Sequence, residues 1–347
     1  MLGVRSPARV EPRVAVGTWA RVLRTGNLPA GVPLDAVSRW LLITRASVFS
    51  MTLTSAALGG LLAARHGEFD WLAFALAAVG LVLSHGVNNM VNDLLDFQSG
   101  VDTPDYARAQ YAPHPLLGGL VSQRVLVGAI VLANALAGAI AVYLAVVRGW
   151  PVLAFAGAGF LISVFYVARP VRLKHHGLGE PAVFLVWGPL MIGGTYFVTT
   201  GTIEPWVFLA SIPYALLVTT VLIGKHLDKH EQDKAKGIHT LVVLLGERAS
   251  LALNRALFVA FYLLVVTLIV TGVLGIWTAA VAFSLPRLRA VLRAYAQPKP
   301  QTRPANYPIW PLWYVAWAFI LNRPAGYLFV AGLGLNALFP LYVPLLR

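Results

Sequence analysis

The sequence contains no cysteine among its 347 residues. This absence excludes disulfide bonds, thiolate metal sites, iron–sulfur clusters and thiol nucleophiles. Charged residues are also scarce: they make up 12% of the chain, whereas hydrophobic residues make up 58%. Soluble domains carry about 25% charged residues, so this composition indicates an integral membrane protein. Residues 1–35 lack the apolar segment of a signal peptide, and we therefore do not expect one there.

Apolar runs of about 20 residues, enough to cross a hydrocarbon layer of ~30 Å, recur along most of the chain. The aromatic segment 307–322 is shorter and interrupted by proline, which favours an interfacial or re-entrant segment. We expect an all-α integral membrane protein with a flexible basic cytoplasmic tail at 1–38 and one polytopic domain at 39–347. The predicted spans are nine, at residues 40–64, 71–91, 122–147, 151–168, 181–200, 204–224, 251–273, 275–296 and 325–345.

Basic residues are distributed unevenly between the connections. The alternate connections hold only Arg65 and Arg148, whereas the other loops and the N-terminal segment are rich in lysine and arginine. By the positive-inside rule the basic loops are cytoplasmic. We expect the N-terminus inside and, for nine spans, the C-terminus outside, in a plasma membrane of the bacterial type. The net charge of +13 then reflects basic loops beside anionic lipid headgroups rather than nucleic acid.

A polar stripe lies at the end of the second apolar run. Residues 88–102, NNMVNDLLDFQSGVD, contain three asparagines and three aspartates. On a helix, the polar residues from His85 to Asp96 fall within an arc of about 140°. Polar groups are costly in lipid, so this arc should face a cavity; the alternative is an ordinary solvated helix end. Because the dipole at a helix C-terminus disfavours anions, the acids there require nearby cations.

A second acidic cluster follows the sixth apolar run, on the same predicted membrane face. Residues 224–241, GKHLDKHEQDKAKGIHTL, combine three acids with several lysines. Two facing clusters of oxygen ligands suit Mg²⁺, which binds through few carboxylates plus the phosphates of a substrate. The surplus of lysine and arginine suits the same substrate, because a diphosphate needs additional counter-charge. His226 and His230 have the spacing of a transition-metal pair, but no cysteine or HExxH motif accompanies them.

These motifs resemble those of the UbiA superfamily of intramembrane prenyltransferases, over residues 38–296. The resemblance rests on Asn-Asp-x-x-Asp at 92–96, the later Asp102 and the second acidic motif. Three further segments are similar to the MenA-like branch, which prenylates a naphthoate: SGVDTP (99–104), GLGEPAVFLVWGPLMIGGTYFVTTG (177–201) and DKAKGIHTL (233–241).

Two positions depart from the usual motifs of this superfamily. Gly100 stands where quinone-making relatives have a third aspartate, so Asp102 would have to substitute for it. Asp228 and Asp233 are five residues apart rather than four, and on an unbroken helix they would point about 140° apart. Either the helix ends between them and the chain folds back, or Glu231 shares the ligation.

The resemblance implies a lateral-entry helical bundle with an active-site cap that faces the cytoplasm. It implies transfer of a polyprenyl group from a prenyl diphosphate to an aromatic acceptor, with Mg²⁺ or Mn²⁺ as cofactor, in quinone biosynthesis of the menaquinone type. The implied metal ligands are Asn92, Asp93, Asp96, Asp102, Asp228, Glu231 and Asp233. The implied diphosphate-binding residues are Arg45, Arg108, Arg172, Lys174, Lys225 and Asn88. The implied catalytic residues are Asp96, Asp228, Lys174 and Tyr166.

Several alternatives stay open at this point. Tyr166 would steady the carbocation with its ring face or belong to an interfacial aromatic belt. His114 would contact phosphate or an acceptor carboxylate, or only shape its loop. The acceptor could equally be hydroxybenzoate, homogentisate, a chlorin or a sugar phosphate. From other classes, a cation-coupled secondary transporter is the main rival, although transporters usually place charge near the midplane; a non-catalytic scaffold would not need two acidic motifs.

Overall fold

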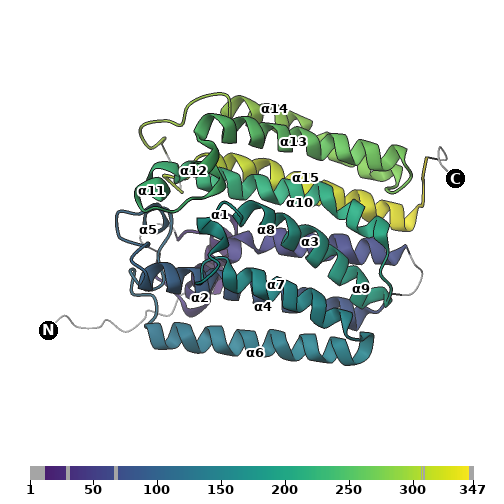
Figure 1. Cartoon of the computed structure of the whole chain (residues 1–347), viewed down its shortest axis with the longest axis horizontal. Coiled ribbons are helices and arrows are strands. Elements are labelled where there is room, and N and C mark those ends of the chain that lie inside the picture. Colours follow the sequence, from purple (N-terminus) through teal and green to yellow (C-terminus); the bar gives the residue numbers. More distant parts are fainter. Residues whose placement is uncertain (1–11, 29–31, 66–68, 306, 308, 344–347) are drawn as a thin grey trace.

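The structure, a computed structural model, describes residues 12–28, 32–65, 69–305, 307 and 309–343. Its helices lie side by side in one bundle (Figure 1). The α-helices are α1 (Pro12–Thr25), α2 (Ala36–Ile43), α3 (Phe49–Ala64), α4 (Trp71–Gln98), α5 (Ala107–Tyr111), α6 (Gln123–Arg148), α7 (Pro151–Phe165), α8 (Gly179–Leu185), α9 (Gly194–Thr200), α10 (Pro205–Asp228), α11 (His230–Ala235), α12 (Leu241–Leu245), α13 (Glu247–Val270), α14 (Leu285–Ala294) and α15 (Tyr314–Leu338). The short helices α5, α11 and α12 gather at one end of the bundle, at the left of Figure 1.

Seven helical segments in the described part of the chain are long and apolar enough to cross a membrane. Of these, α10 is the most buried and lies in the middle of the bundle, whereas α6 lies along one edge (Figure 1). Helix α6 exposes large apolar side chains such as Val131, Leu132 and Val146. Lipid can cover such a surface, whereas soluble proteins rarely expose large apolar patches to water. The prediction of an all-α, multi-pass membrane protein is confirmed.

The helix boundaries differ from the predicted spans where the backbone is interrupted. The first predicted span is divided into α2, the 3₁₀ helix η1 (Ala46–Val48) and α3, because Arg45 adopts a left-handed conformation with φ 53°. The fifth is divided by a π-helical segment, η3 (Val186–Gly193), which contains Pro189. Proline has no N–H to donate and so disturbs regular α-helical bonding. The eighth begins as a 3₁₀ helix, η4 (Ile276–Ser284), and continues as α14.

The last span was predicted to begin at residue 325, and this boundary is wrong. Helix α15 begins at Tyr314 and continues through Pro324 to Leu338. Residues 314–322 of the aromatic segment are therefore the first turns of a long helix. Helix α7, with 15 residues, and the η4–α14 segment lie outside the seven long apolar segments, so the count of nine spans stays a prediction.

Part of the predicted flexible tail is helical. Residues 12–25 form α1, whose Val22 is fully buried. The indole Nε1 of Trp19 donates to Asp35 Oδ1 at 3.0 Å, and Asp35 also caps α2 by accepting from Ser38 N. These contacts fix α1 to the bundle, which the polar composition of the segment did not indicate. Residues 1–11 and 29–31 of the predicted tail lie outside the described residues.

Candidate functional site

A cavity of about 810 Å³ lies inside the bundle, between α3, α4, α6, α7, η3, α10 and α15. Most of its lining side chains are apolar, and no aspartate or glutamate is among the lining residues. The cations that line it are Arg24, Arg45, Arg108, Lys225, Arg287 and Arg323. A largely apolar cavity with several cations and no lining acid suits a ligand that has a long apolar part and an anionic group.

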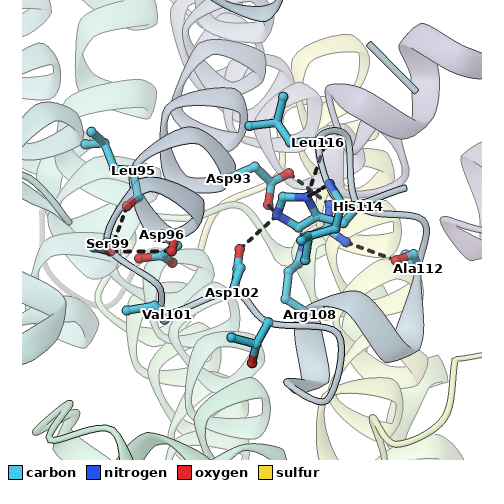
Figure 2. Close-up of polar contacts among 12 residues, drawn as sticks. Asp93, Leu95, Asp96, Ser99, Val101, Asp102, Arg108, Ala112, His114 and Leu116 are labelled. Atoms are coloured by element: carbon cyan, nitrogen blue, oxygen red, sulfur yellow. Dashed lines mark hydrogen bonds and ion pairs between the residues drawn. The ribbon is translucent and has the colours of Figure 1, made fainter. Parts of the chain in front are cut away.

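The first acidic motif lies near the C-terminal end of α4, with Asp93 at its centre (Figure 2). The Asp93 side chain is fully buried and accepts from Arg108 Nε at 2.8 Å and Nη2 at 2.9 Å. It also pairs with Arg45 from the loop before η1. Both arginines line the cavity, whereas Asp93 does not. Asp93 therefore stands behind the two guanidinium groups and supplies their counter-charge, rather than facing a ligand itself.

His114 lies beside this network, with its Nε2 3.8 Å from Asp93 Oδ1, and it is hydrogen-bonded to Asp102 (Figure 2). Its Nδ1 accepts from the backbone N–H groups of Leu116 and Leu117, both at 3.2 Å. The ring proton must then lie on Nε2, which donates to Asp102 Oδ2 at 3.0 Å. His114 thus shapes the loop that follows α5. Asp93, Asp102 and His114 offer ligand atoms within 4.8 Å of one another, but the two guanidinium groups already neutralise Asp93, so a metal ion there is disfavoured.

Asp96 has a different partner, one turn further along α4. Its carboxylate accepts from Lys174 Nζ at 2.8 Å. Burial alone would lower the pKa of Lys174, but the Asp96 carboxylate raises it above its ordinary value. Asn92 lies one turn earlier, lines the cavity, and has a buried Oδ1 without a hydrogen-bond partner among the described residues. Asn88 also lines the cavity and accepts from Ser163 Oγ at 3.0 Å.

The second acidic motif supplies Asp233 to the same end of the bundle. Its Oδ1 accepts from Tyr106 Oη at 2.5 Å and lies 3.4 Å from Lys229 Nζ. Its buried Oδ2 has no partner in the described part of the chain. Burial would raise the pKa of Asp233, yet the charge of Lys229 lowers it below its ordinary value. Burial also raises the pKa of Tyr106, and the Asp233 carboxylate raises it further.

Asp228 and Glu231 occupy positions unlike those predicted. Asp228 accepts from the backbone N–H groups of Tyr314 at 2.9 Å and Val315 at 3.0 Å, and so caps the first turn of α15. Glu231 is 83% exposed and contacts His230. Helix α10 ends at Asp228 and α11 begins two residues later, which explains the spacing of five. Because Asp228 is occupied by these backbone N–H groups and Glu231 faces solvent, we remove both acids from the set of candidate metal ligands and Asp228 from the catalytic set.

The remaining predicted residues are split between the cavity and its surroundings. Tyr166 and Lys225 both line the cavity. Lys225 forms no ion pair within 4 Å among the described residues. Arg172 does not line the cavity; it adopts φ 48° and leads into the 3₁₀ turn η2 (Leu173–His175) that carries Lys174. Of the predicted site residues, six line the cavity: Arg45, Asn88, Asn92, Arg108, Tyr166 and Lys225.

Two features were missed. Glu180 of α8 pairs with His226 of α10 at 2.7 Å, and both side chains are buried. The single acid in the segment GLGEP did not indicate a histidine partner on another helix. Arg24 and Arg323 line the cavity, but each lies outside the acidic motifs that guided the sequence analysis.

The donor set fits a divalent cation. Asn92 Oδ1, Asp102 Oδ1 and Asp233 Oδ2 are buried oxygens without hydrogen-bond partners among the described residues. Buried polar atoms are normally satisfied, and an exception requires an explanation such as an ion. Oxygen atoms from carboxylates and amides are the ligands that Mg²⁺ uses. Asn92, Asp102 and Asp233 supply these free oxygens, and Asp96 uses its Oδ2 for Lys174. These four residues are the candidates to hold such an ion, because both carboxylate oxygens of Asp93 and of Asp228 already accept hydrogen bonds.

Comparison with known proteins identifies a family. The profile of the UbiA prenyltransferase family matches residues 53–322. A 1,4-dihydroxy-2-naphthoate octaprenyltransferase of Bacillus subtilis (strain 168) is 25% identical over 260 residues, which is 74% of this chain and 81% of the relative. A UbiA prenyltransferase domain-containing protein 1 of Danio rerio is 28% identical over 294 residues, 83% of this chain and 85% of the relative.

Solved structures show the same fold. A UbiA homolog from Aeropyrum pernix K1 has a TM-score of 0.63 and 20% identity, and covers 84% of this chain and 98% of that one. A UbiA homolog from Archaeoglobus fulgidus bound to GPP and Mg²⁺ has a TM-score of 0.55 and 16% identity, with 85% of this chain and 99% of that one covered. At these identities the likeness concerns the fold alone.

Proposed function

The chain belongs to the UbiA prenyltransferase family, and we propose that it transfers a polyprenyl group to an aromatic acid of the 1,4-dihydroxy-2-naphthoate type. The donor is a polyprenyl diphosphate, and the product enters quinone biosynthesis of the menaquinone type. The observation that carries the proposal is the cavity: a mostly apolar space of about 810 Å³ whose lining, among the described residues, includes cations but no carboxylate. A relative from Bacillus subtilis bears the name of this naphthoate activity, which supports the choice of acceptor.

The residues at the polar end of the cavity perform separate tasks in this reaction. Arg45, Arg108 and Lys225 line the cavity, and their N–H groups would bind the diphosphate of the donor. Lys174, held by Asp96 at 2.8 Å, would add a further positive charge beside the departing group. Such preorganised donors stabilise charge that develops in the transition state. A divalent ion, when bound by Asn92, Asp96, Asp102 and Asp233, would supply Lewis-acid stabilisation of the leaving diphosphate.

The allylic carbon becomes cationic as its bond to the diphosphate oxygen breaks. Tyr166 lines the cavity close to this end, and its ring face would steady the cation by a cation–π interaction. The apolar walls from α6, α7 and η3 exclude water, which would otherwise capture the cation. The aromatic ring then forms a carbon–carbon bond with the allylic carbon, and diphosphate is released. The attacked ring carbon loses the group that it carried, a proton or a carboxyl group as CO₂, and the ring becomes aromatic again.

The membrane topology belongs to the same proposal. Both acidic motifs and the basic loops lie at one end of the bundle, and the positive-inside rule places that end in the cytoplasm. The N-terminus is then inside. The acidic acceptor would reach the site from the cytoplasm and the released diphosphate would leave to it, while the polyprenyl chain extends between the helices.

The acceptor is tested with the purified full-length protein and Mg²⁺. A polyprenyl diphosphate is supplied together with 1,4-dihydroxy-2-naphthoate, 4-hydroxybenzoate or homogentisate in separate reactions, and prenylated products are identified by mass spectrometry. We expect product with the naphthoate and little with the others. Product with another acceptor only would refute the naphthoate assignment but keep the prenyl transfer. A companion experiment profiles quinones in a deletion strain, where loss of menaquinone is the expected result.

A further inference from the structure

The C-terminal turn of α1 forms part of the cavity wall. Arg24, Thr25 and Gly26 are among the residues that line it. The family profile matches residues 53–322, so α1 lies outside the region on which family membership rests. The sequence alone indicated a flexible tail here. A segment that precedes the matched region therefore contributes directly to the substrate cavity, and its side chains need an explanation of their own.

Several contacts hold this turn against the cavity. Arg323 of α15 donates through Nη1 to Arg24 O at 3.0 Å and through Nη2 to Ser47 O at 2.7 Å. The Asn27 amide donates to Tyr111 O at the end of α5. Three elements around the cavity (α15, η1 and α5) thus position one turn of α1. The position of the Arg24 backbone is fixed, which places its side chain reproducibly at the cavity mouth.

Arg24 differs from the cations that are paired with the first acidic motif, and it shares the lack of an ion pair among the described residues with Lys225, Arg287 and Arg323, which also line the cavity. Arg45 and Arg108 are paired with Asp93, and Lys174 is paired with Asp96. Arg24 is exposed at the mouth and forms no ion pair among the described residues. Next to it, α15 presents Phe319 and Ile320 to the cavity. An unpaired guanidinium beside an apolar wall matches a flat aromatic ring that carries one carboxylate, because arginine binds carboxylates through a planar pair of N–H groups.

We propose that Arg24 binds the carboxylate of the aromatic acceptor, so that α1 and α15 together form the acceptor-binding side of the cavity. This inference rests on the proposed function, since it requires an acidic aromatic acceptor. The diphosphate is served by the cations grouped around the first acidic motif on α4. Arg24 is held instead by α15 and η1, and the remaining anionic group in the reaction is that of the acceptor.

The test measures binding of two probes to the full-length protein in detergent: 1,4-dihydroxy-2-naphthoate and its uncharged carboxamide. In Arg24→Gln, we expect the Kd for the acid to rise about tenfold, as for loss of one charge-assisted hydrogen bond at a solvent-exposed site. The Kd for the carboxamide and the KM for prenyl diphosphate should change less than twofold. Arg21→Gln is the matched control, because Arg21 lies on the same helix, is exposed and does not line the cavity.

An unchanged Kd for the acid in Arg24→Gln would overturn the proposal, and so would a raised KM for prenyl diphosphate with unchanged acid binding. The proposed function fails separately, if the wild-type protein prenylates no aromatic acid. If Arg24→Gln does not fold, labelling decides the question. The chain has no cysteine, so Thr25→Cys introduces a single thiol at the cavity and Arg21→Cys a single thiol away from it. The naphthoate should slow maleimide labelling at position 25 only; equal rates with and without it would contradict the proposal.

Discussion

Replacing Asp93 with asparagine keeps the shape of this side chain but removes the charge that faces Arg45 and Arg108. The wild-type carboxylate is fully buried and accepts three hydrogen bonds from the two guanidinium groups. An amide presents only one oxygen and places an N–H₂ group against a cation. In Asp93→Asn, two buried or half-buried arginines therefore face each other without their anion.

The expected cost follows from this geometry. Removing one partner of a buried ion pair typically costs about 3–5 kcal/mol, because the remaining charge is left uncompensated. Asp93 serves two cations, so we expect the free energy of unfolding to fall by at least about 3 kcal/mol. A bound diphosphate would restore an anion beside both arginines. The stabilisation that prenyl diphosphate and Mg²⁺ provide should then be at least as large in Asp93→Asn as in the wild type.

Thermal unfolding followed by tryptophan fluorescence measures both effects, since the chain contains ten tryptophans. Tm is recorded for the wild type, Asp93→Asn and the control Asp102→Asn, each with and without Mg²⁺ and prenyl diphosphate. Asp102 has a single partner, His114, and its substitution should cost less. If Asp93 were a metal ligand, its loss would weaken binding and shrink the ligand-induced rise in Tm. A smaller rise in Asp93→Asn than in the wild type would therefore refute the reasoning.

Four other substitutions test the remaining assignments. Asp96→Asn should lower kcat by about 10²–10³-fold, as for loss of one charge-stabilising group, and near-normal turnover by a folded variant would contradict its role. Asp228→Ala should lower stability by about 1–2 kcal/mol through loss of a helix cap, while the Mg²⁺ concentration that gives half-maximal activity stays unchanged. Neutralising Arg172 and Lys174 together should raise KM for prenyl diphosphate more than KM for the acceptor; equal increases would argue against the assignment. The pKa of Asp233 is lowered in the folded protein, so its charge stabilises the folded state fully above the unfolded pKa of about 3.9. This stabilisation is lost as pH falls through the folded pKa. Asp233→Asn should therefore flatten the acidic side of a plot of Tm against pH.

The polar stripe on α4 shows what periodicity alone predicts. Helical geometry placed Asn88, Asn92 and Asp96 on one face. Asn88 and Asn92 line the cavity, whereas Asp96 does not and pairs with Lys174. The requirement that each acid should have a cation is also met, by Lys174 for Asp96 and by two arginines for Asp93. These predictions succeeded because an unpaired acid in a membrane is costly whichever cation neutralises it, so the need for a cation can be predicted without knowing its position.

The partners themselves could not be predicted. Asp93 and Asp96 point about 60° apart on a helix, and the sequence gives no indication which of them faces η1 and which faces the loop before α8. Asp228 lies within a motif that suggested metal binding, yet it caps α15, which begins 86 residues later in the chain. Such a contact depends on how α10 and α15 pack, and no local pattern encodes it.

Asp93 lies behind Arg108 and occupies only some of its N–H donors. A guanidinium has five N–H donors, and Arg108 uses two for Asp93 and one for Ala112 O. Two donors are left on a side chain that lines the cavity. An anionic ligand can therefore bind Arg108 without breaking its pair with Asp93, and the buried carboxylate keeps the guanidinium plane in one orientation while the ligand enters and leaves. Asp93 thus fixes the direction in which the two remaining donors of Arg108 meet a ligand. A lysine in place of Arg108 would lose this double use, because an ammonium is a point charge without a planar set of donors.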